Sequence, residues 1–113
     1  MLEKSERPWG RYEVLQEAAN YKVKSIHVFP GKRLSYHRHQ KRSEHWYITQ
    51  GIGEVTLDGK IQPVIAGSII QVPQGMLHRI SNNGSTELIF IEVQTGSYFG
   101  EDDIERVEDD FGR

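Results

Sequence analysis

The chain has no cysteine among its 113 residues. Disulfide bonds and thiolate metal sites are therefore excluded, and any bound metal ion must take nitrogen or oxygen ligands. The chain also lacks a hydrophobic run that approaches the roughly 20 residues needed to span a bilayer. Its first ten residues have no apolar stretch of signal-peptide length. We therefore expect a soluble, cytoplasmic protein with no membrane partner.

An excess of charge of either sign is absent as well. The 14 lysine and arginine residues stand against 16 aspartate and glutamate residues, so the net charge at pH 7 is -2. This balance argues against a nucleic-acid partner, because nucleic-acid-binding domains carry a positive excess. The length suits one domain over residues 1–113, and the chain contains no internal repeat, low-complexity segment or linker.

The sequence does contain a succession of short segments rich in β-branched and aromatic residues, separated by turn residues. We predict nine strands, at residues 11–16, 21–29, a short segment around His37, 44–50, 54–57, 60–64, 68–72, 78–81 and 86–94. Asp58-Gly59 joins two of these strands, and the pair suits the positive dihedral angles of a type I′ hairpin turn.

Only the segment from Gly100 onward looks helical. Three acidic residues supply negative charge to a first turn, and Ile104, Val107 and Phe111 follow at helical spacing. The whole chain is therefore predicted to be all-β, a sandwich or small barrel that ends in a short helix.

The densest group of metal-capable side chains lies in the segment 31–51, which begins and ends with glycine. His37 and His39 are two residues apart, so on an extended strand both imidazoles point to the same face. Glu44 follows after an odd number of residues. It can face the same way only if the chain bends at residues 40–43 and resumes as a neighbouring strand.

A second pattern surrounds His78. Its spacing is Gly67, five residues, Pro73, one residue, Gly75, two residues, His78, three residues and Asn82. The Pro-x-Gly turn can bring His78 against the first pattern, which completes a set of three imidazoles and one carboxylate. Such a set suits a divalent transition metal, zinc first and also manganese, iron, cobalt or nickel, and it leaves one or two coordination positions open.

Together the two spacings resemble the two cupin motifs, including the final glycine of the first motif and the asparagine of the second. The resemblance implies a single-domain cupin jelly-roll β-barrel with the metal in its mouth, and often a homodimer. It also implies that His37, His39, Glu44 and His78 are the metal ligands.

A closer resemblance covers nearly the whole chain. The segments RPWGRY, YKVKSIHVFPGKRLSYH, RSEHWYITQG, IEVQTG and GEDDIERVEDDFGR are similar to the C-terminal domain of type II mannose-6-phosphate isomerases, which is usually fused to a mannose-1-phosphate guanylyltransferase. These 113 residues have no Gly-rich nucleotide loop, so we expect no nucleotidyl transfer from them. Where that family commonly has Gln-x-His, this chain has His37-Arg38-His39, as in a general cupin.

The resemblance implies that mannose 6-phosphate and fructose 6-phosphate are interconverted through a cis-enediol. A base must carry a proton between carbons 1 and 2, and the candidates are Glu92 and Glu54. The substrate's phosphate needs cations. We expect Arg42 and Arg79 to bind it, because guanidinium binds phosphate oxygens in pairs. Arg42 and Glu92 are the predicted catalytic residues. Trp46 is a further candidate for substrate binding, with barrel core as the alternative.

Simpler explanations exist for several of these residues. The four metal-capable side chains could form a polar interior without metal, although burying them unpaired would be costly. His45 alternates away from Glu44 and is expected to face outward. His27 is expected to be structural, and Asn82 to cap a turn. Two further functions stay open, namely an oxidative or lyase cupin acting on another small molecule, and a non-catalytic sugar- or metabolite-binding module.

Overall fold

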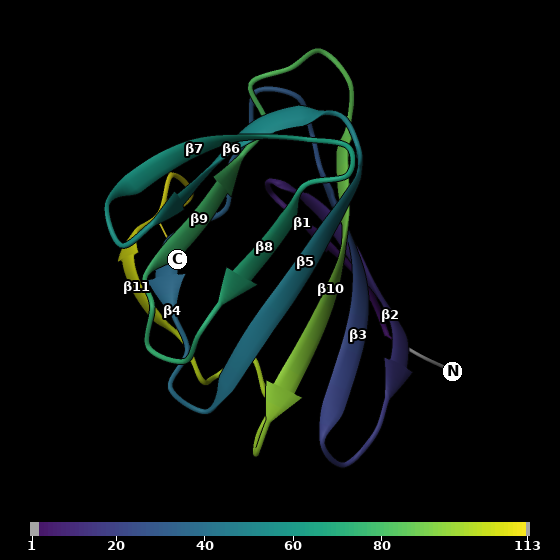
Figure 1. Cartoon of the computed structure of the whole chain (residues 1–113), viewed down its shortest axis with the longest axis vertical. Coiled ribbons are helices and arrows are strands. Elements are labelled where there is room, and N and C mark those ends of the chain that lie inside the picture. Colours follow the sequence, from purple (N-terminus) through teal and green to yellow (C-terminus); the bar gives the residue numbers. More distant parts are fainter. Residues whose placement is uncertain (1–2, 113) are drawn as a thin grey trace.

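The computed structural model describes residues 3–112, which form two antiparallel β-sheets around a shared interior (Figure 1). The larger sheet has the order β1-β2-β3-β10-β5-β8. Its strands are β1 (Lys4–Arg7), β2 (Gly10–Glu17), β3 (Tyr21–Val28), β10 (Leu88–Gly96), β5 (Arg42–Gln50) and β8 (Ile69–Val72). The smaller sheet has the order β11-β4-β9-β6-β7. Its strands are β11 (Glu105–Glu108), β4 (Tyr36–Arg38), β9 (His78–Ser81), β6 (Ile52–Leu57) and β7 (Lys60–Ile65).

The interior is apolar at one end and polar at the other. Burial alternates along β3 and β10, so every second side chain of these strands points inward. In both strands the inward side chains are hydrophobic at one end and polar at the other, and β3 runs from Lys22 and Lys24 to Ile26 and Val28. On β10 the sequence runs from Leu88 and Phe90, which are fully buried in the core, to Glu92 and Gln94. The polar end is therefore the place where the fold can hold a chemical site.

The prediction of an all-β jelly roll is confirmed, and the nine predicted strands correspond to β2 to β10. The Asp58-Gly59 turn is observed with φ values of 45° and 84° at its two residues, and it joins β6 to β7. β1 and β11 were not predicted. Within residues 3–112 the structure contains no helix that is long and apolar enough to span a membrane.

The predicted C-terminal helix is wrong. The segment from Gly100 forms turns and then β11, which pairs with β4. Its acidic side chains find partners elsewhere in the fold, since Glu101 pairs with Lys24, and the Asp103 carboxylate accepts hydrogen bonds from two backbone N–H groups at residues 40 and 41. These long-range contacts outweigh the weak helical preference of the segment.

The final glycine of the first motif has a structural cause. Gly51 lies between β5 and β6 with a φ of 94°, and a Cβ atom there would lie 2.8 Å from the carbonyl oxygen of Glu87. A residue with a side chain would be strained in its backbone and would also clash with the neighbouring chain. The motif therefore needs glycine where the chain passes from the larger sheet to the smaller one.

Candidate metal centre and binding cavity

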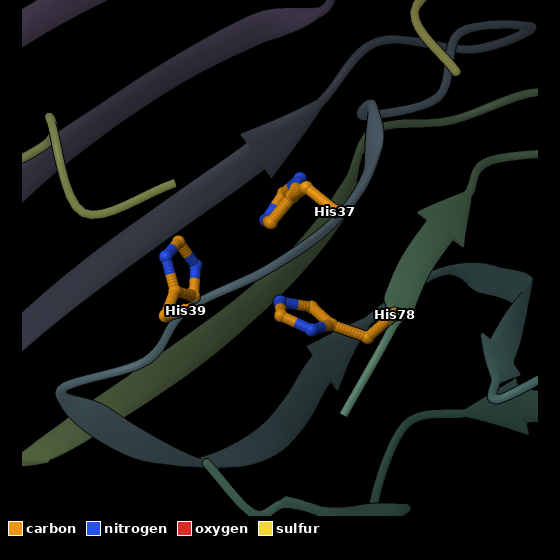
Figure 2. Close-up of side chains that lie close together, drawn as sticks. All are labelled: His37, His39 and His78. Carbon is orange, nitrogen blue, oxygen red and sulfur yellow. The ribbon is translucent and has the colours of Figure 1, made fainter. Parts of the chain in front are cut away.

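Three buried histidines converge at the polar end of the interior. His37 lies in β4 and is the direct partner of His78, the first residue of β9, while His39 follows β4 by one residue. One ligand nitrogen from each ring lies within 4.8 Å of the others. Figure 2 shows the three rings pointing toward one another. The spacing of the two motifs thus predicted this cluster correctly.

Each ring is oriented through its Nδ1 atom. The Nδ1 of His37 lies 2.7 Å from the hydroxyl of Ser35, that of His39 lies 2.6 Å from the carbonyl oxygen of Asp103, and that of His78 lies 2.9 Å from the carbonyl oxygen of Met76. A carbonyl oxygen only accepts hydrogen bonds, so Nδ1 carries the proton in His39 and His78. The lone pair of each ring is then on Nε2, which is the arrangement usual for metal-binding histidines. In His39 this lone pair faces Nη2 of Arg42 at 3.1 Å, so a metal ion would replace that hydrogen bond.

The electrostatics of the cluster favour neutral rings. Burial, together with the neighbouring rings of His78 and His39, holds the pKa of His37 well below its usual value. Burial also lowers the pKa of His39. Neutral imidazole is the form that binds a metal ion, so no proton has to be displaced at neutral pH.

Glu44 lies beside the histidine cluster. Its Oε2 atom is 3.5 Å from Nε2 of His39, and its Oε1 atom is 3.8 Å from Nε2 of His78. Arg42 donates a hydrogen bond to Oε2 through Nε, and Trp46 donates one to Oε1 through its indole nitrogen, both at 3.0 Å. Burial alone would raise the pKa of Glu44, but the surrounding positive charge holds it below its usual value. Three imidazoles and this ionised carboxylate suit a divalent transition metal, and the donor set does not select one ion.

The way Glu44 reaches the cluster differs from the expectation. The chain does bend within the expected segment, at residues 40 and 41, but β5 joins the larger sheet, whereas β4 and β9 belong to the smaller one. Glu44 therefore faces the histidines across the interior and not from a neighbouring strand. Two strands on opposite sheets can present side chains to one point because their inner faces pack together.

Glu92, one of the two candidate bases, is buried and lines the same interior. Its direct partners are Lys24 on β3 and Trp46 on β5. Gln94 donates a hydrogen bond of 2.6 Å to Oε1 of Glu92. Burial, together with the negative charge of Glu44, raises the pKa of Glu92 to about 8. The other candidate base, Glu54, is exposed on β6.

The two arginines proposed for phosphate binding are both buried. Arg42 bonds to Glu44 through Nε, and its Nη2 atom lies 3.1 Å from Nε2 of His39. Its Nη1 atom is buried without a hydrogen-bond partner among the residues that the structure describes. Arg79 donates to the carbonyl oxygen of Leu34 and to the Glu108 carboxylate, both at 2.9 Å. Arg42 therefore has a free N–H group for a ligand, while Arg79 is engaged by the C-terminal segment.

A cavity of about 100 Å³ connects these groups. The segment of residues 97–110, here called the C-terminal strap, passes from the end of β10 in the larger sheet to β11 in the smaller one (Figure 1). It contributes Glu101, Ile104 and Arg106 to the lining of the cavity. Sequence reasoning missed Glu101 and also Lys24, which lines the cavity from β3. The sequence could have indicated that Lys24 points inward, because it lies two residues from the apolar Ile26 and so on the same face of the strand.

The remaining sequence candidates lie outside the cavity lining. His45 is exposed, and its Nε2 atom lies 2.7 Å from Nε2 of Gln71. His27 lies within hydrogen-bond distance of Ser25 and Glu87. Asn82 is buried, and its amide bonds to the backbone at Val28, Thr86 and Gly84. These contacts agree with the structural roles expected for the three residues.

The jelly roll and the histidine cluster in its mouth define a cupin domain. Residues 1–109 match the family described as mannose-6-phosphate isomerase C-terminal, and the chain belongs to that family.

Two of the proteins that this chain resembles in sequence are much longer than it is. The chain is 45% identical over 107 residues to the alginate biosynthesis protein AlgA of Pseudomonas aeruginosa, covering 95% of the chain and 22% of that protein. It is 42% identical over 104 residues to a mannose-1-phosphate guanylyltransferase of Sinorhizobium fredii, covering 92% of the chain and 20% of that protein. Among solved structures, oxalate decarboxylase from Bacillus subtilis superposes with a TM-score of 0.82 at 21% identity, over 94% of this chain and 30% of that one. This last likeness concerns the fold alone.

Proposed function

We propose that the domain is a metal-dependent isomerase that interconverts mannose 6-phosphate and fructose 6-phosphate. The observation that carries the proposal is the meeting, in one buried cavity, of the imidazole cluster with a carboxyl group of raised pKa on Glu92. Membership of the family supports the choice of substrate. The chain spans 20% to 22% of the two relatives described above, so the activities named for those proteins do not decide the activity of this domain.

The metal ion would be held by His37, His39, His78 and Glu44, with zinc as the first candidate. When bound, it would act as a Lewis acid on the sugar's carbonyl and hydroxyl oxygens and stabilise the negative charge that develops as a proton leaves carbon 2. The protein fixes the rings for this task through their Nδ1 contacts.

Glu92 is the proposed general base. Its carboxylate takes the proton from carbon 2 and returns it to carbon 1, while a hydroxyl proton moves between the two sugar oxygens, so that the cis-enediol leads to the ketose. Its raised pKa makes the carboxylate a stronger base than an ordinary glutamate. Gln94 restricts its orientation through the hydrogen bond to Oε1.

Arg42 is the proposed contact to the substrate's anionic oxygens, through its free Nη1 group. Arg79 has a weaker case, since its donors are already used. The ring of Trp46 packs against Phe90 at 4.8 Å between centroids and against His78 at 5.7 Å, and its indole nitrogen bonds to Glu44. These contacts favour a role for Trp46 in the core and in orienting Glu44 over sugar stacking.

A coupled assay for fructose 6-phosphate formed from mannose 6-phosphate tests the proposal, with elemental analysis of the same sample. Turnover should follow metal loading, and His39→Ala should abolish it while the exposed His45→Ala keeps it. A sample with one equivalent of metal and no turnover with zinc, cobalt, manganese or magnesium would overturn the isomerase function. Oxygen consumption with substrate would instead support an oxidative cupin, and binding without turnover a non-catalytic module. Homodimer formation and a cytoplasmic location stay predictions.

A further inference from the structure

The carboxylate of Glu101 occupies a place between buried cations at the cavity mouth. Glu101 comes from the C-terminal strap and forms an ion pair with Lys24, whose side chain is 5% exposed. The charges of Arg42 and Lys22 also act on Glu101, and together with Lys24 they hold its pKa below its usual value although burial opposes the shift. All three cations are buried and none is more than 8% exposed.

Three buried cations thus act on one carboxylate, whose own side chain is 44% exposed. This is an unusual arrangement for an ion pair with only a structural role. Lysine is rarely buried unless it is paired, because removing its charge from water is costly. Lys22 has a second acidic neighbour, but the Oε1 atom of Glu17 is 4.0 Å away on a side chain that is 56% exposed. Two further carboxyl groups line the cavity beside Lys24 and Arg42, namely Glu44, which pairs with Arg42 at 3.0 Å, and Glu92, the strand partner of Lys24. The carboxylate in direct contact with Lys24 is that of Glu101, which comes from the strap and not from the sheet.

The cavity lining continues from Lys24 toward the rim. Lys24 lies 4.5 Å from the centroid of the Tyr12 ring, and the guanidinium of Arg7 lies 5.3 Å from it. Arg7 also lines the cavity, and it donates hydrogen bonds to two neutral groups, namely the backbone oxygen of Glu6 and the hydroxyl of Tyr12. A second cation is therefore available close to Lys24 without a carboxylate bound to it among the contacts of the described residues.

We propose that Lys24 and Arg42, which both line the cavity, bind the phosphate group of a sugar phosphate. The Glu101 carboxylate occupies this phosphate position until a sugar phosphate displaces it. The inference rests on the proposed function, of which it assigns the phosphate site. A phosphate monoester carries about 1.5 to 2 negative charges and three acceptor oxygens, whereas a carboxylate carries one charge and two oxygens. A phosphorylated sugar therefore replaces the Lys24–Glu101 pair with a stronger one, and an unphosphorylated sugar has no charge with which to do so.

The attachment of the strap makes this exchange local. The strap stays fixed next to Glu101 by the hydrogen bonds from backbone N–H groups to Asp103, at 3.0 and 2.9 Å, and farther along by the pairing of β11 with β4. Glu101 lines the cavity, and its side chain remains 44% exposed. Its side chain can move into solvent without release of the rest of the strap.

Isothermal titration of the metal-loaded chain with inorganic phosphate, mannose 6-phosphate and mannose tests the proposal. Glu101→Gln removes the competing charge and should tighten phosphate and mannose 6-phosphate about tenfold. Lys24→Met should weaken both by about tenfold or more, because it removes a charged hydrogen-bond donor. In the double variant the effect of Glu101→Gln should vanish. Mannose should bind equally to all four proteins.

Glu105→Gln is the matched control. It removes the exposed 2.7 Å ion pair with Arg38, which also ties the strap to β4, and it should leave phosphate binding unchanged. Equal tightening by Glu105→Gln and Glu101→Gln would show that loosening of the strap is the cause and would overturn the proposal, as would unchanged phosphate binding in Lys24→Met. If Lys24→Met does not fold, the comparison of the two strap variants still decides. Because phosphate binding is read without turnover, failure of the isomerase assay and failure of this site are distinguishable.

Discussion

Arg42 and Glu44 form an ion pair inside the protein, with 3.0 Å between Nε and Oε2 and no more than 4% of either residue exposed. They are two residues apart on β5, so both point inward. The pair joins the proposed metal centre to the proposed substrate contact. When no metal is bound, Arg42 supplies a permanent positive charge in direct contact with the Glu44 carboxylate.

Arg42→Met should therefore destabilise the metal-free protein by about 3–5 kcal/mol, because it leaves a buried carboxylate without its partner. Zinc should stabilise the variant more than the wild type, since the ion restores a positive charge beside Glu44. Urea unfolding with and without zinc measures both effects. Arg38→Met, which breaks an exposed ion pair with Glu105, should change stability by less than about 1 kcal/mol. Similar losses in the two variants would contradict the role given to the buried pair.

His39→Ala should lower metal occupancy sharply and leave the β-rich circular dichroism spectrum intact. The imidazole supplies one of the three nitrogens of the cluster, and the fold around it is held by two sheets. Elemental analysis after dialysis gives the occupancy. His45→Ala removes an exposed histidine from the strand that carries Glu44 and should retain full occupancy. Retention of the metal by His39→Ala would remove His39 from the ligand set.

Ser35→Ala tests the orientation of His37. The serine is buried, and its hydroxyl lies 2.7 Å from Nδ1 of the ring. Loss of such an outer contact typically weakens metal binding by about 10- to 100-fold. Competition with a chromogenic chelator measures the affinity. Ser43→Ala, which removes a hydroxyl bonded to Thr95 on the outside of β5, is the control. An unchanged affinity in Ser35→Ala would mean that the strand alone positions His37.

The two motifs predicted the histidine cluster because their spacing is fixed by turns and by strand alternation. The route by which Glu44 joins the cluster was not predictable in the same way, since a bend at residues 40–43 fits either the neighbouring strand or the opposite sheet. β1 and β11 gave no signal of alternating hydrophobic and polar residues, because their sequences, KSER and ERVE, contain a single hydrophobic residue between them.

The acidic end of the chain shows the main limit of local reasoning. Negative charge near Gly100 suits a helix start, but the carboxylate of Glu101 pairs with Lys24, which is 77 residues away in sequence. No local pattern contains that pairing. The sequence does place Lys22 and Lys24 on the same strand face as the apolar Ile26 and Val28. Charged residues on a face that is otherwise apolar are inconsistent with a simple core strand, and Lys24 lines a part of the cavity that the two motifs do not cover.

Asn82→Ala should destabilise the protein by about 3 kcal/mol, as three hydrogen bonds to backbone groups are lost and their partners are left buried. Its Nδ2 atom bonds to the carbonyl oxygens of Val28 and Thr86, so it ties the turn after β9 to the end of β3. Chemical denaturation measures the loss. Asn83→Ala, at the exposed neighbouring position, should have little effect. A small loss in Asn82→Ala would mean that water replaces these bonds.

Acid should loosen the C-terminal strap. The pKa of Glu101 is lower in the folded protein than in the unfolded chain, where it is about 4.3. A group with a depressed folded pKa contributes stability above its unfolded pKa, and this contribution is lost as the pH falls through the folded value. Limited proteolysis of the strap should therefore show increasing cleavage as the pH falls below about 4, which is near the pKa of an unperturbed glutamate. Glu101→Gln should be cleaved like the wild type near neutral pH, because the hydrogen bonds to Asp103 and the pairing of β11 with β4 still hold the strap. It should show a smaller change on acidification, because its side chain does not titrate. If the two proteins follow the same pH curve, the attachment of the strap depends on its other acids, such as Asp103 and Asp110, whose pKa values are also lowered.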